Sequence, residues 1–180
     1  MRLATSNLNV QLYCGDARDC DDGMGGVDLV LTNPYTALPA CLIDKPMILS
    51  HDLARKDKWE SHVGPLTEIG RWNVAQQIKG HGAVQGVWVK GLDPVPVDLE
   101  HLCPEMFEPG RGWWPLDLPV RLLEVYAKQV ECESNYPLRV WDGFCGRGTT
   151  GRACQLLGHD FIGIDIDPAR IAWAQRYLGV

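Results

Sequence analysis

A turn rich in glycine carries residues whose spacing could bind a nucleotide-like cofactor. Gly146, Gly148 and Gly151 follow a predicted strand and open a predicted helix, in the stretch WDGFCGRGTTG. Asp165 and Asp167 end the next predicted strand, about 20 residues further on. Glycines let a ligand approach the backbone closely, and a carboxylate at the end of the following strand accepts hydrogen bonds from ribose hydroxyls. The combination predicts a cofactor site rather than a tight turn without a ligand.

Two features favour S-adenosylmethionine over a nicotinamide dinucleotide as this cofactor. The turn begins under about 40 residues from the end of the sequence, which is too few for the second half of a dinucleotide-binding fold. Asp142 stands directly before the turn, where a carboxylate suits a cationic ligand better than a pyrophosphate. S-adenosylmethionine carries a sulfonium, an ammonium and a ribose but no phosphate, so we expect it to be the cofactor.

A second segment with chemical potential lies near the start of the chain, where a predicted strand over 27–32 ends in Asn33, Pro34 and Tyr35. The Asn33 side-chain oxygen and the Pro34 carbonyl could accept the two N–H groups of an exocyclic amine. The Tyr35 ring could stack on a base that has left its helix. Taken alone, the triplet is weak evidence and is more typical of a plain turn, so its interpretation depends on the rest of the chain.

These two segments carry a family resemblance. The glycine turn and the strand and helix after it resemble the DPFCGSGTT-type cofactor motif of DNA amino-methyltransferases, with Gly143 for the usual proline and Arg147 for the usual serine. The triplet resembles the (D/N/S)PP(Y/F) catalytic motif with one proline missing. A GD segment precedes the triplet and the cofactor motif follows it, which is the permuted order of the β class. The chain is identified as a minimal-length β-class DNA N6-adenine or N4-cytosine methyltransferase.

The resemblance implies roles for particular residues. The loop from Phe144 to Thr149 would surround the methionine part of the cofactor, Asp165 would bind its ribose, and Asp16 would contact its adenine. The implied reaction is methyl transfer to an exocyclic amino group of a DNA base, as in DNA modification by restriction–modification systems, and no metal is expected. The expected catalytic residues are Asn33, Pro34 and Tyr35, and the expected cofactor residues are Asp16, Asp142, Phe144, Cys145, Gly146, Gly148, Thr149 and Asp165.

The segment before the cofactor motif departs further from the family pattern. WWPLDLP resembles a weaker version of HPTQKP, with Leu118 in place of the lysine. Trp113 and Trp114, beside Arg111 in a loop rich in proline, are candidates for a place near a ligand.

The elements that must position these residues follow an α/β pattern. Strands are predicted over 9–13, 27–32, 83–90, 138–141 and 160–166, and helices over 66–79, 116–130, 149–157 and 168–178. We expect a doubly wound, mostly parallel sheet of the Rossmann-like methyltransferase type, permuted and truncated. With 180 residues, one methyltransferase domain over 1–180 is expected, with 45–115 as its variable, target-facing segment.

Charge and composition bear on the partner and the compartment. The chain has a net charge of −6, yet residues 45–90 hold seven Lys or Arg and four acids. We expect Arg55, Lys56 and Lys58 to contact DNA, although charge runs also mark ordinary solvated surface. No apolar run is long enough to span a bilayer and no signal peptide is apparent, so a cytoplasmic protein is expected. Seven cysteines without a CxxC pair indicate reduced thiols.

Two other functions stay open at this point. The irregular catalytic triplet and the short middle of the chain also fit a non-catalytic, decayed methyltransferase that binds cofactor or nucleic acid. A methyltransferase that acts on RNA or protein is the other alternative. Labelled cofactor offered with DNA, RNA or protein would separate the three.

Overall fold

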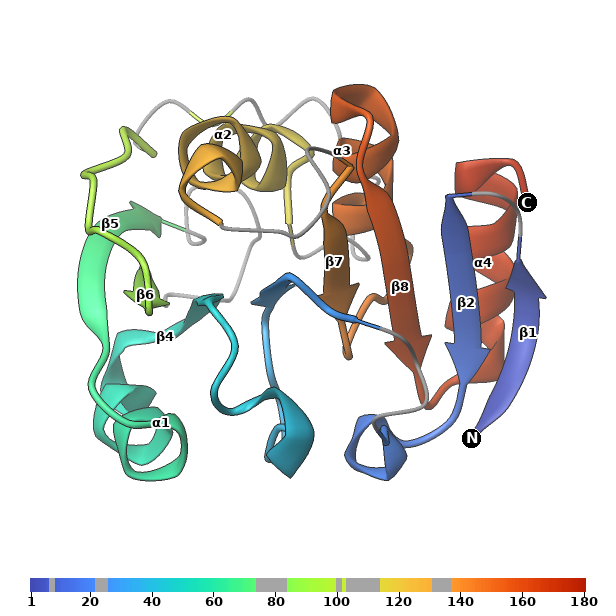
Figure 1. Cartoon of the computed structure of the whole chain (residues 1–180), viewed down its shortest axis with the longest axis horizontal. Helices are drawn as coiled ribbons and strands as arrows, with labels where there is room; N and C mark the ends of the chain where they lie inside the picture. The colour runs from blue at the N-terminus through green and yellow to red at the C-terminus, as the bar shows by residue number, and fades with distance from the viewer. Residues whose placement is uncertain (7–8, 22–25, 74–83, 100–101, 103–113, 131–136) are drawn as a thin grey trace.

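The protein folds around one eight-stranded sheet, seen in a computed structural model (Figure 1). The structure describes residues 1–180 except 7–8, 22–25, 74–83, 100–101, 103–113 and 131–136. The described strands are β1 (Arg2–Ser6), β2 (Val10–Cys14), β3 (Leu29–Thr32), β4 (Met47–Asp52), β5 (Thr67–Asn73), β6 (Val84–Lys90), β7 (Arg139–Asp142) and β8 (Asp160–Asp165). The described α-helices are α1 (Lys56–Val63), α2 (Asp117–Tyr126), α3 (Thr149–Leu157) and α4 (Pro168–Leu178).

The strands lie in the order β1-β2-β8-β7-β3-β4-β6-β5. The five central strands, β2 to β4 in this order, pair in parallel, whereas β1, β6 and β5 join antiparallel at the two edges. Parallel strands bring their carboxyl ends to one edge of the sheet, so the residues that follow β3, β7 and β8 meet there. This arrangement confirms the predicted doubly wound, mostly parallel α/β fold.

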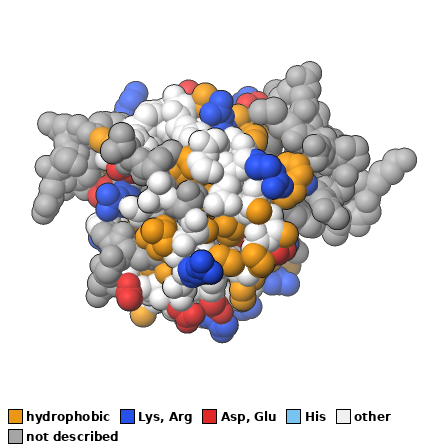
Figure 2. All heavy atoms as spheres, turned by 90° about the vertical axis from the view of Figure 1, so that its right-hand side faces the viewer, with side chains coloured by type: hydrophobic (Ala, Val, Ile, Leu, Met, Phe, Trp, Pro, Cys, Tyr) orange, Lys and Arg blue, Asp and Glu red, His pale blue; other side chains and the backbone are white. Residues whose placement is uncertain are grey.

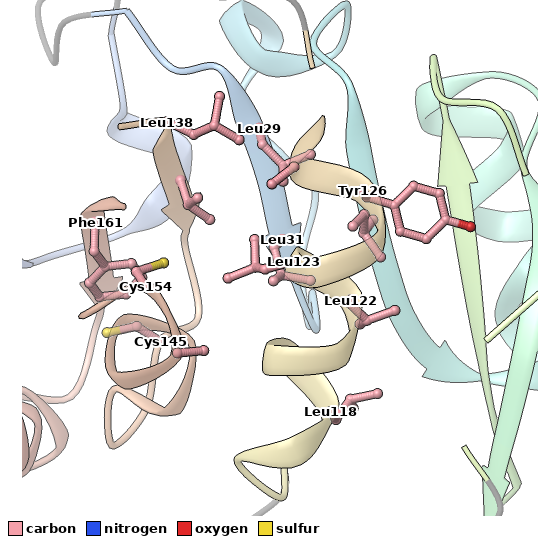
Figure 3. Packing of buried hydrophobic residues seen from close by; sticks show 14 of the residues in the cluster. Leu29, Leu31, Leu118, Leu122, Leu123, Tyr126, Leu138, Cys145, Cys154 and Phe161 are labelled. Carbon is pink, nitrogen blue, oxygen red and sulfur yellow. The ribbon is translucent and has the colours of Figure 1, made fainter. Parts of the chain in front are cut away.

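Each face of the sheet is covered by a separate apolar cluster. One cluster packs α2, α3 and α4 against the sheet, and the other packs α1 with the 3-10 helices η1 (Ala17–Asp19) and η3 (Ala40–Leu42). Figure 3 shows Leu123 of α2 beside Leu31 of β3. Leu118 and Leu122 belong to the same cluster, and Leu29 and Leu31 are fully buried. β3 is buried on both faces, which explains why its sequence is an unbroken apolar run.

The two C-terminal helices begin and end as their sequences predict. Asp167 caps α4, because its side chain accepts a 2.8 Å hydrogen bond from the N–H of Ala169, and Pro168 occupies the first turn. α3 ends at Gly158 and α4 at Gly179, both in the left-handed conformation. Among the described residues, no helix is long and apolar enough to cross a membrane.

The predicted helix over 66–79 is wrong where the structure describes it, because β5 occupies Thr67–Asn73. The apolar spacing of three that indicated a helix arises from a β-bulge between Glu68 and Gly70. The extra residue turns Ile69 to the same face as Trp72, and both join one buried cluster. Residues 75 and 78 of the predicted stripe lie outside the described residues.

The number of strands was also underestimated, since five were predicted and eight are described. Besides β5, the strands β1 and β4 were not predicted. β4 reads MILSHD and follows a proline without any alternation of apolar and polar residues, so only its pairing with β3 and β6 identifies it. In the segment over 45–115, the described parts are therefore β4, α1, β5 and β6 with short connections.

Candidate active site

A pocket of about 490 Å³ opens at the carboxyl edge of the parallel strands. Its size falls within the usual range for a small-molecule site. Residues after β3, residues after β7 and the start of α4 contribute to its walls. The lining residues are Asn33, Tyr35, Trp114, Asp142, Phe144, Cys145, Gly146, Arg147, Thr149, Thr150, Asp167, Ala169, Arg170 and Trp173.

The pocket brings together most of the residues singled out in the sequence. Two of the three expected catalytic residues and five of the eight expected cofactor residues line it: Asn33, Tyr35, Asp142, Phe144, Cys145, Gly146 and Thr149. The other four lie outside the lining: Pro34, Asp16, Gly148 and Asp165. Trp114 also lines the pocket, whereas Trp113 and Arg111 lie outside the described residues.

Asp142 is the buried hub of the site. Its carboxylate accepts hydrogen bonds of 2.7 Å from each of the Thr32 and Thr150 hydroxyls, and one of 3.1 Å from the N–H of Phe144. Burial raises the pKa of Asp142 to about 6, against the opposing effect of these three hydrogen bonds. The carboxylate thus joins the end of β3 to the cofactor loop and to the first turn of α3. Neither threonine was predicted from the sequence. The role of Thr32 appears only when β3 and β7 pair, and that of Thr150 appears only when the first turn of α3 packs on Asp142.

Asp165 is hydrogen-bonded to the backbone of the cofactor loop. It is buried and accepts hydrogen bonds from the N–H groups of Gly146, at 3.0 Å, and Asp167, at 2.9 Å. Arg170 lies 3.6 Å from Asp165 and 3.7 Å from Asp167. Asp167, rather than Asp165, lines the pocket. The ribose contact of Asp165 therefore stays a prediction, and Asp167 is a second carboxylate at the same strand end.

Asp16 is held by a local ion pair. Its carboxylate caps the N–H of Arg18 at 2.9 Å and contacts the Arg18 guanidinium at 2.5 Å. The hydrogen bond from that guanidinium lowers the pKa of Asp16 to about 2. Asp16 follows β2, next to β8 in the sheet, but it does not line the pocket. Its contact with the cofactor adenine stays a prediction.

Backbone conformation and close packing explain why the turn has glycine at positions 146 and 148. Gly146 and Gly148 adopt positive φ angles of 52° and 86°, which favour glycine. Gly148 is the residue before α3 and offers no side chain to cap its first turn. A Cβ at Gly148 would also lie 3.1 Å from Leu178 and 3.3 Å from Ala174 of α4. Gly148 therefore shapes the turn and lets α4 pack closely behind it.

Gly143 has an equally clear reason to differ from the proline of the resembled motif. A Cβ at this position would lie 2.1 Å from Cη2 of Trp141 and 2.9 Å from the Cβ of Ala17. The Trp141 ring is fully buried and occupies the space that a proline would need. The large Trp141 ring beside Gly143 thus explains why this chain has glycine where the resembled motif has proline.

Gly143→Ala is expected to destabilise the protein by about 2–3 kcal/mol, the usual cost of forcing extra atoms into a packed core. Gly26→Ala is the matched control, because a Cβ at Gly26 would meet nothing within 4 Å. Urea unfolding of both variants measures the effect. Equal free energies of unfolding for Gly143→Ala and the wild type would contradict the steric explanation.

Tyr35 stands at the mouth of the pocket in a chain of aromatic contacts. Its ring is 49% exposed and meets Phe144 edge-to-face, with 6.0 Å between the centroids. The Tyr35 ring also lies 6.3 Å from His51, and His51 lies 6.0 Å from Trp59 of α1. An exposed ring that makes edge contacts with two neighbouring rings can offer its face to a flat ligand.

The three basic residues that are expected to contact DNA lie in or next to α1, which carries Trp59 at the far end of these aromatic contacts. Arg55 ends the 3-10 helix η4 (Leu53–Arg55), and Lys56 and Lys58 belong to α1. Lys56 pairs with Glu60 at 3.3 Å, and Lys58 lies 5.9 Å from the centre of the Trp59 ring. Two aromatic contacts therefore connect α1 to Tyr35.

Besides Thr150, Asp167 and Ala169, three larger pocket side chains were not recognised from the sequence as site residues. Arg147 and Arg170 reach the pocket from the cofactor loop and from α4, and Trp173 lies one turn further along α4. The available signal was Arg147 itself, a charged residue where the resembled motif has serine. Trp173 gave no such signal, because an aromatic residue on an amphipathic helix usually belongs to the core.

The match to a known family covers most of the chain. Residues 53–176 match the family model of N6/N4 methyltransferases described as DNA methylase. The chain belongs to this DNA methylase family. Membership confirms the predicted reaction, methyl transfer from S-adenosylmethionine to an amino group of a DNA base. The matched range contains the cofactor motif but begins after Asn33, Pro34 and Tyr35, so the catalytic triplet stays a prediction.

Solved structures show the same fold at low identity. The M1.HpyAVI–SAM complex has a TM-score of 0.67 and 17% identity over 95% of this DNA methylase and all of that chain. The cytosine-N4-specific PvuII DNA methyltransferase has a TM-score of 0.60 and 15% identity, over 96% of this chain and 87% of its own. TTHA0409, a putative DNA modification methylase from Thermus thermophilus complexed with S-adenosyl-L-methionine, gives 0.56 and 17% over 96% and 95%. No sequence among the curated proteins matches.

The pocket of this DNA methylase suits S-adenosylmethionine in shape and in chemistry. Gly146, with its positive φ, brings the backbone of the loop to the pocket, and the buried carboxylate of Asp142 also lines it. Asp167, which follows β8, and Arg170 of α4 supply polar groups, and four aromatic residues supply apolar walls. The pocket therefore combines charged, polar and aromatic groups.

Proposed function

We propose that this DNA methylase methylates adenine at N6 or cytosine at N4, and that Asn33, Pro34 and Tyr35 act on the target base. The observation that supports these roles is the pairing of β3 with β7, in which Val30 lies opposite Trp141. This pairing sets the triplet after β3 beside the cofactor loop after β7. Asn33 and Tyr35 consequently share one pocket with Phe144, Gly146 and Thr149.

The proposed roles follow from the chemistry of an exocyclic amine. Its nitrogen lone pair is delocalised into the base ring, so the nitrogen attacks well only after it moves toward tetrahedral geometry. The side-chain oxygen of Asn33 and the main-chain carbonyl of Pro34 would accept its two N–H groups and favour that geometry. The Tyr35 ring would stack on the displaced base. The bound cofactor supplies the electrophilic methyl group.

Two hydrogen bonds to Asp142 and one ring contact connect the end of β3 to the cofactor loop and hold this geometry. Thr32 directly precedes Asn33, and its hydroxyl bonds to Asp142 at 2.7 Å. The same carboxylate holds the N–H of Phe144, whose ring contacts Tyr35. One buried acid therefore sets both the amine-binding residue and the stacking ring.

DNA is the proposed partner, approached from the α1 side. Arg55, Lys56 and Lys58 would contact the phosphate backbone, because α1 lies next to the aromatic chain that ends at Tyr35. Lys56 is already paired with Glu60, so we propose that Arg55 and Lys58 contribute more than Lys56. The whole chain acts as a single catalytic domain in this proposal.

The triple variant Arg55→Ala, Lys56→Ala, Lys58→Ala is expected to weaken DNA binding and flatten its salt dependence. Each phosphate contact that is lost reduces the number of counterions released on binding. The slope of log K against log salt then falls by about 1 for each contact. Fluorescence anisotropy at several salt concentrations measures this slope. Arg139→Ala, on β7 at the opposite end from the pocket, is the control. An unchanged slope in the triple variant would place the DNA contacts elsewhere.

A methylation assay with labelled S-adenosylmethionine tests the function as a whole. Double-stranded DNA, RNA and a protein mixture are offered separately. We expect label in DNA alone, at adenine N6 or cytosine N4 after nuclease digestion. Cofactor binding without label in any acceptor would instead identify a decayed, non-catalytic binder.

A further inference from the structure

Residues 35–38, here called the Tyr35 loop, are attached at their far end to a histidine of helix α1. Residues 35–37 are exposed, whereas Leu38 is buried. The Nε2 atom of His62, in the last turn of α1, lies 3.0 Å from the backbone nitrogen of Leu38 and 3.2 Å from its carbonyl oxygen. The Tyr35 loop therefore continues from the end of β3 on one side and is joined to α1 on the other.

This contact does not depend on which ring nitrogen of His62 carries the proton. With the proton on Nδ1, Nε2 accepts a hydrogen bond from the N–H of Leu38. With the proton on Nε2, the same atom donates a hydrogen bond to the Leu38 carbonyl. His62 therefore holds the backbone of Leu38 in either tautomer.

The Tyr35 ring is connected to the same helix by a second route. Its centre lies 6.3 Å from that of His51, and the His51 ring lies 6.0 Å from Trp59. Trp59 in turn lies 6.2 Å from His62. Because Trp59 is only 1% exposed, it cannot turn away without repacking the core around it. The ring contacts and the bond to Leu38 thus hold both the side chain and the backbone of the Tyr35 loop against α1.

Helix α1 also carries basic residues that are proposed to contact DNA. Lys58 lies four residues before His62, about one helical turn away. On the face that carries α4 and β1, by contrast, Figure 2 shows basic, acidic and apolar side chains interspersed among the described residues. One helix therefore joins the proposed phosphate contacts to the loop that carries the proposed stacking ring.

We propose that His62 is a positioning residue for methyl transfer, which holds the Tyr35 loop so that the Tyr35 ring meets the displaced base. His62 acts through the backbone of Leu38 and does not itself line the pocket. A small displacement of a positioning group lowers the rate of a reaction even when the chemistry takes place elsewhere. This inference rests on the proposed function, since it needs the target base to stack on Tyr35.

Amide hydrogen exchange tests the contact without any need for activity. His62→Leu is expected to speed the exchange of the Leu38 amide about tenfold or more, because that N–H loses its acceptor. His62→Gln keeps an acceptor and a donor at the end of its side chain and should restore most of the protection. Unchanged exchange in His62→Leu overturns the proposal, because other contacts then hold the loop.

Single-turnover methylation of unmethylated genomic DNA, with cofactor and DNA both saturating, tests the positioning role. His62→Leu is expected to lower the rate about tenfold or more, and His62→Gln should recover most of that loss. The affinity for S-adenosylmethionine, measured by calorimetry, should stay within about twofold in both variants. A wild-type rate in His62→Leu, or a parallel fall in cofactor affinity, overturns the proposal.

Gln129 offers a matched control for the simple loosening of a loop. Its side chain also holds both backbone groups of one loop residue: it accepts from the N–H of Asp93 at 2.8 Å and donates to the Asp93 carbonyl at 3.2 Å. Neither residue lines the pocket. Gln129→Leu is therefore expected to keep the methylation rate within about twofold of the wild type. An equal loss of rate in Gln129→Leu and His62→Leu overturns the proposal.

The outcomes also distinguish this inference from the proposed function. If the wild type methylates no DNA, the proposed function fails and the positioning role fails with it. If the wild type methylates DNA and Tyr35→Ala lowers the rate while His62→Leu does not, only the role of His62 fails. If Tyr35→Ala keeps the wild-type rate, the stacking role of Tyr35 fails, and the proposal for His62 is overturned although the methylation activity stands.

Discussion

Asn33→Ala is expected to lower the methylation rate by about 100-fold or more while cofactor affinity stays within twofold of the wild type. Removing the side-chain oxygen takes away one of the two acceptors proposed for the target amine. The cofactor loop and its Asp142 hub do not depend on this side chain, since their hydrogen bonds run through Thr32, Thr150 and the N–H of Phe144. Single-turnover methylation and calorimetry measure the two quantities separately.

Conservative variants at Asn33 provide the control. Asn33→Asp keeps an oxygen acceptor and is a residue that the resembled motif allows, so it should retain more activity than Asn33→Ala. Wild-type rates in Asn33→Ala would show that the triplet has no catalytic role. A parallel loss of cofactor affinity would show that Asn33 shapes the pocket instead.

Asp142→Ala is expected to destabilise the protein by about 3 kcal/mol or more, because it leaves buried donors without their acceptor. Two threonine hydroxyls and one backbone N–H lose a hydrogen bond, and the end of β3 separates from the cofactor loop. Asp142→Asn is the milder partner, since the amide keeps the shape and one oxygen while a threonine hydroxyl can accept from its N–H. Chemical denaturation compares all three proteins.

The pH dependence of this comparison follows from the raised pKa of Asp142. The folded carboxyl, with a pKa of about 6, binds a proton at a pH where the unfolded carboxyl is ionised. Stability from this group therefore rises as pH falls from above 6 toward 4, the opposite of an ordinary surface carboxylate. Between pH 7.5 and pH 5, the wild type should gain about 1 kcal/mol relative to Asp142→Asn. A constant difference over that range would contradict the assignment.

The sequence was most informative where local and long-range signals agreed. The helices over 149–157 and 168–178 have the predicted bounds, because glycine, proline and aspartate mark their ends regardless of the rest of the chain. The glycine turn was predicted with its flanking strands for the same reason. The helix predicted around 66–73 was wrong, because a single bulge changed the spacing of the apolar residues from two, typical of a strand, to three.

The residues of the candidate site also fall into those that the sequence predicted and those that it did not. Asn33, Asp142 and the cofactor loop were predicted, since their residue types sit in a recognisable order along the chain. Thr32 and Thr150 were not, because each gains its role only from a partner on another element. Asp16 and Asp165 were predicted to face the ligand, yet the described geometry directs both mainly to local partners. A sequence pattern places a residue near a site but does not show which neighbour its side chain meets first.

The Thr32–Asp142 hydrogen bond joins residues 110 positions apart, and this separation has a consequence for folding kinetics. Closing so large a loop is slow, and contacts of high sequence separation generally slow the folding of a domain. The C-terminal unit of β7, α3, β8 and α4 is local in sequence, whereas the pocket also needs β3. Competence to bind the cofactor should therefore appear later in refolding than the helical signal of this unit, and stopped-flow experiments can time the two events.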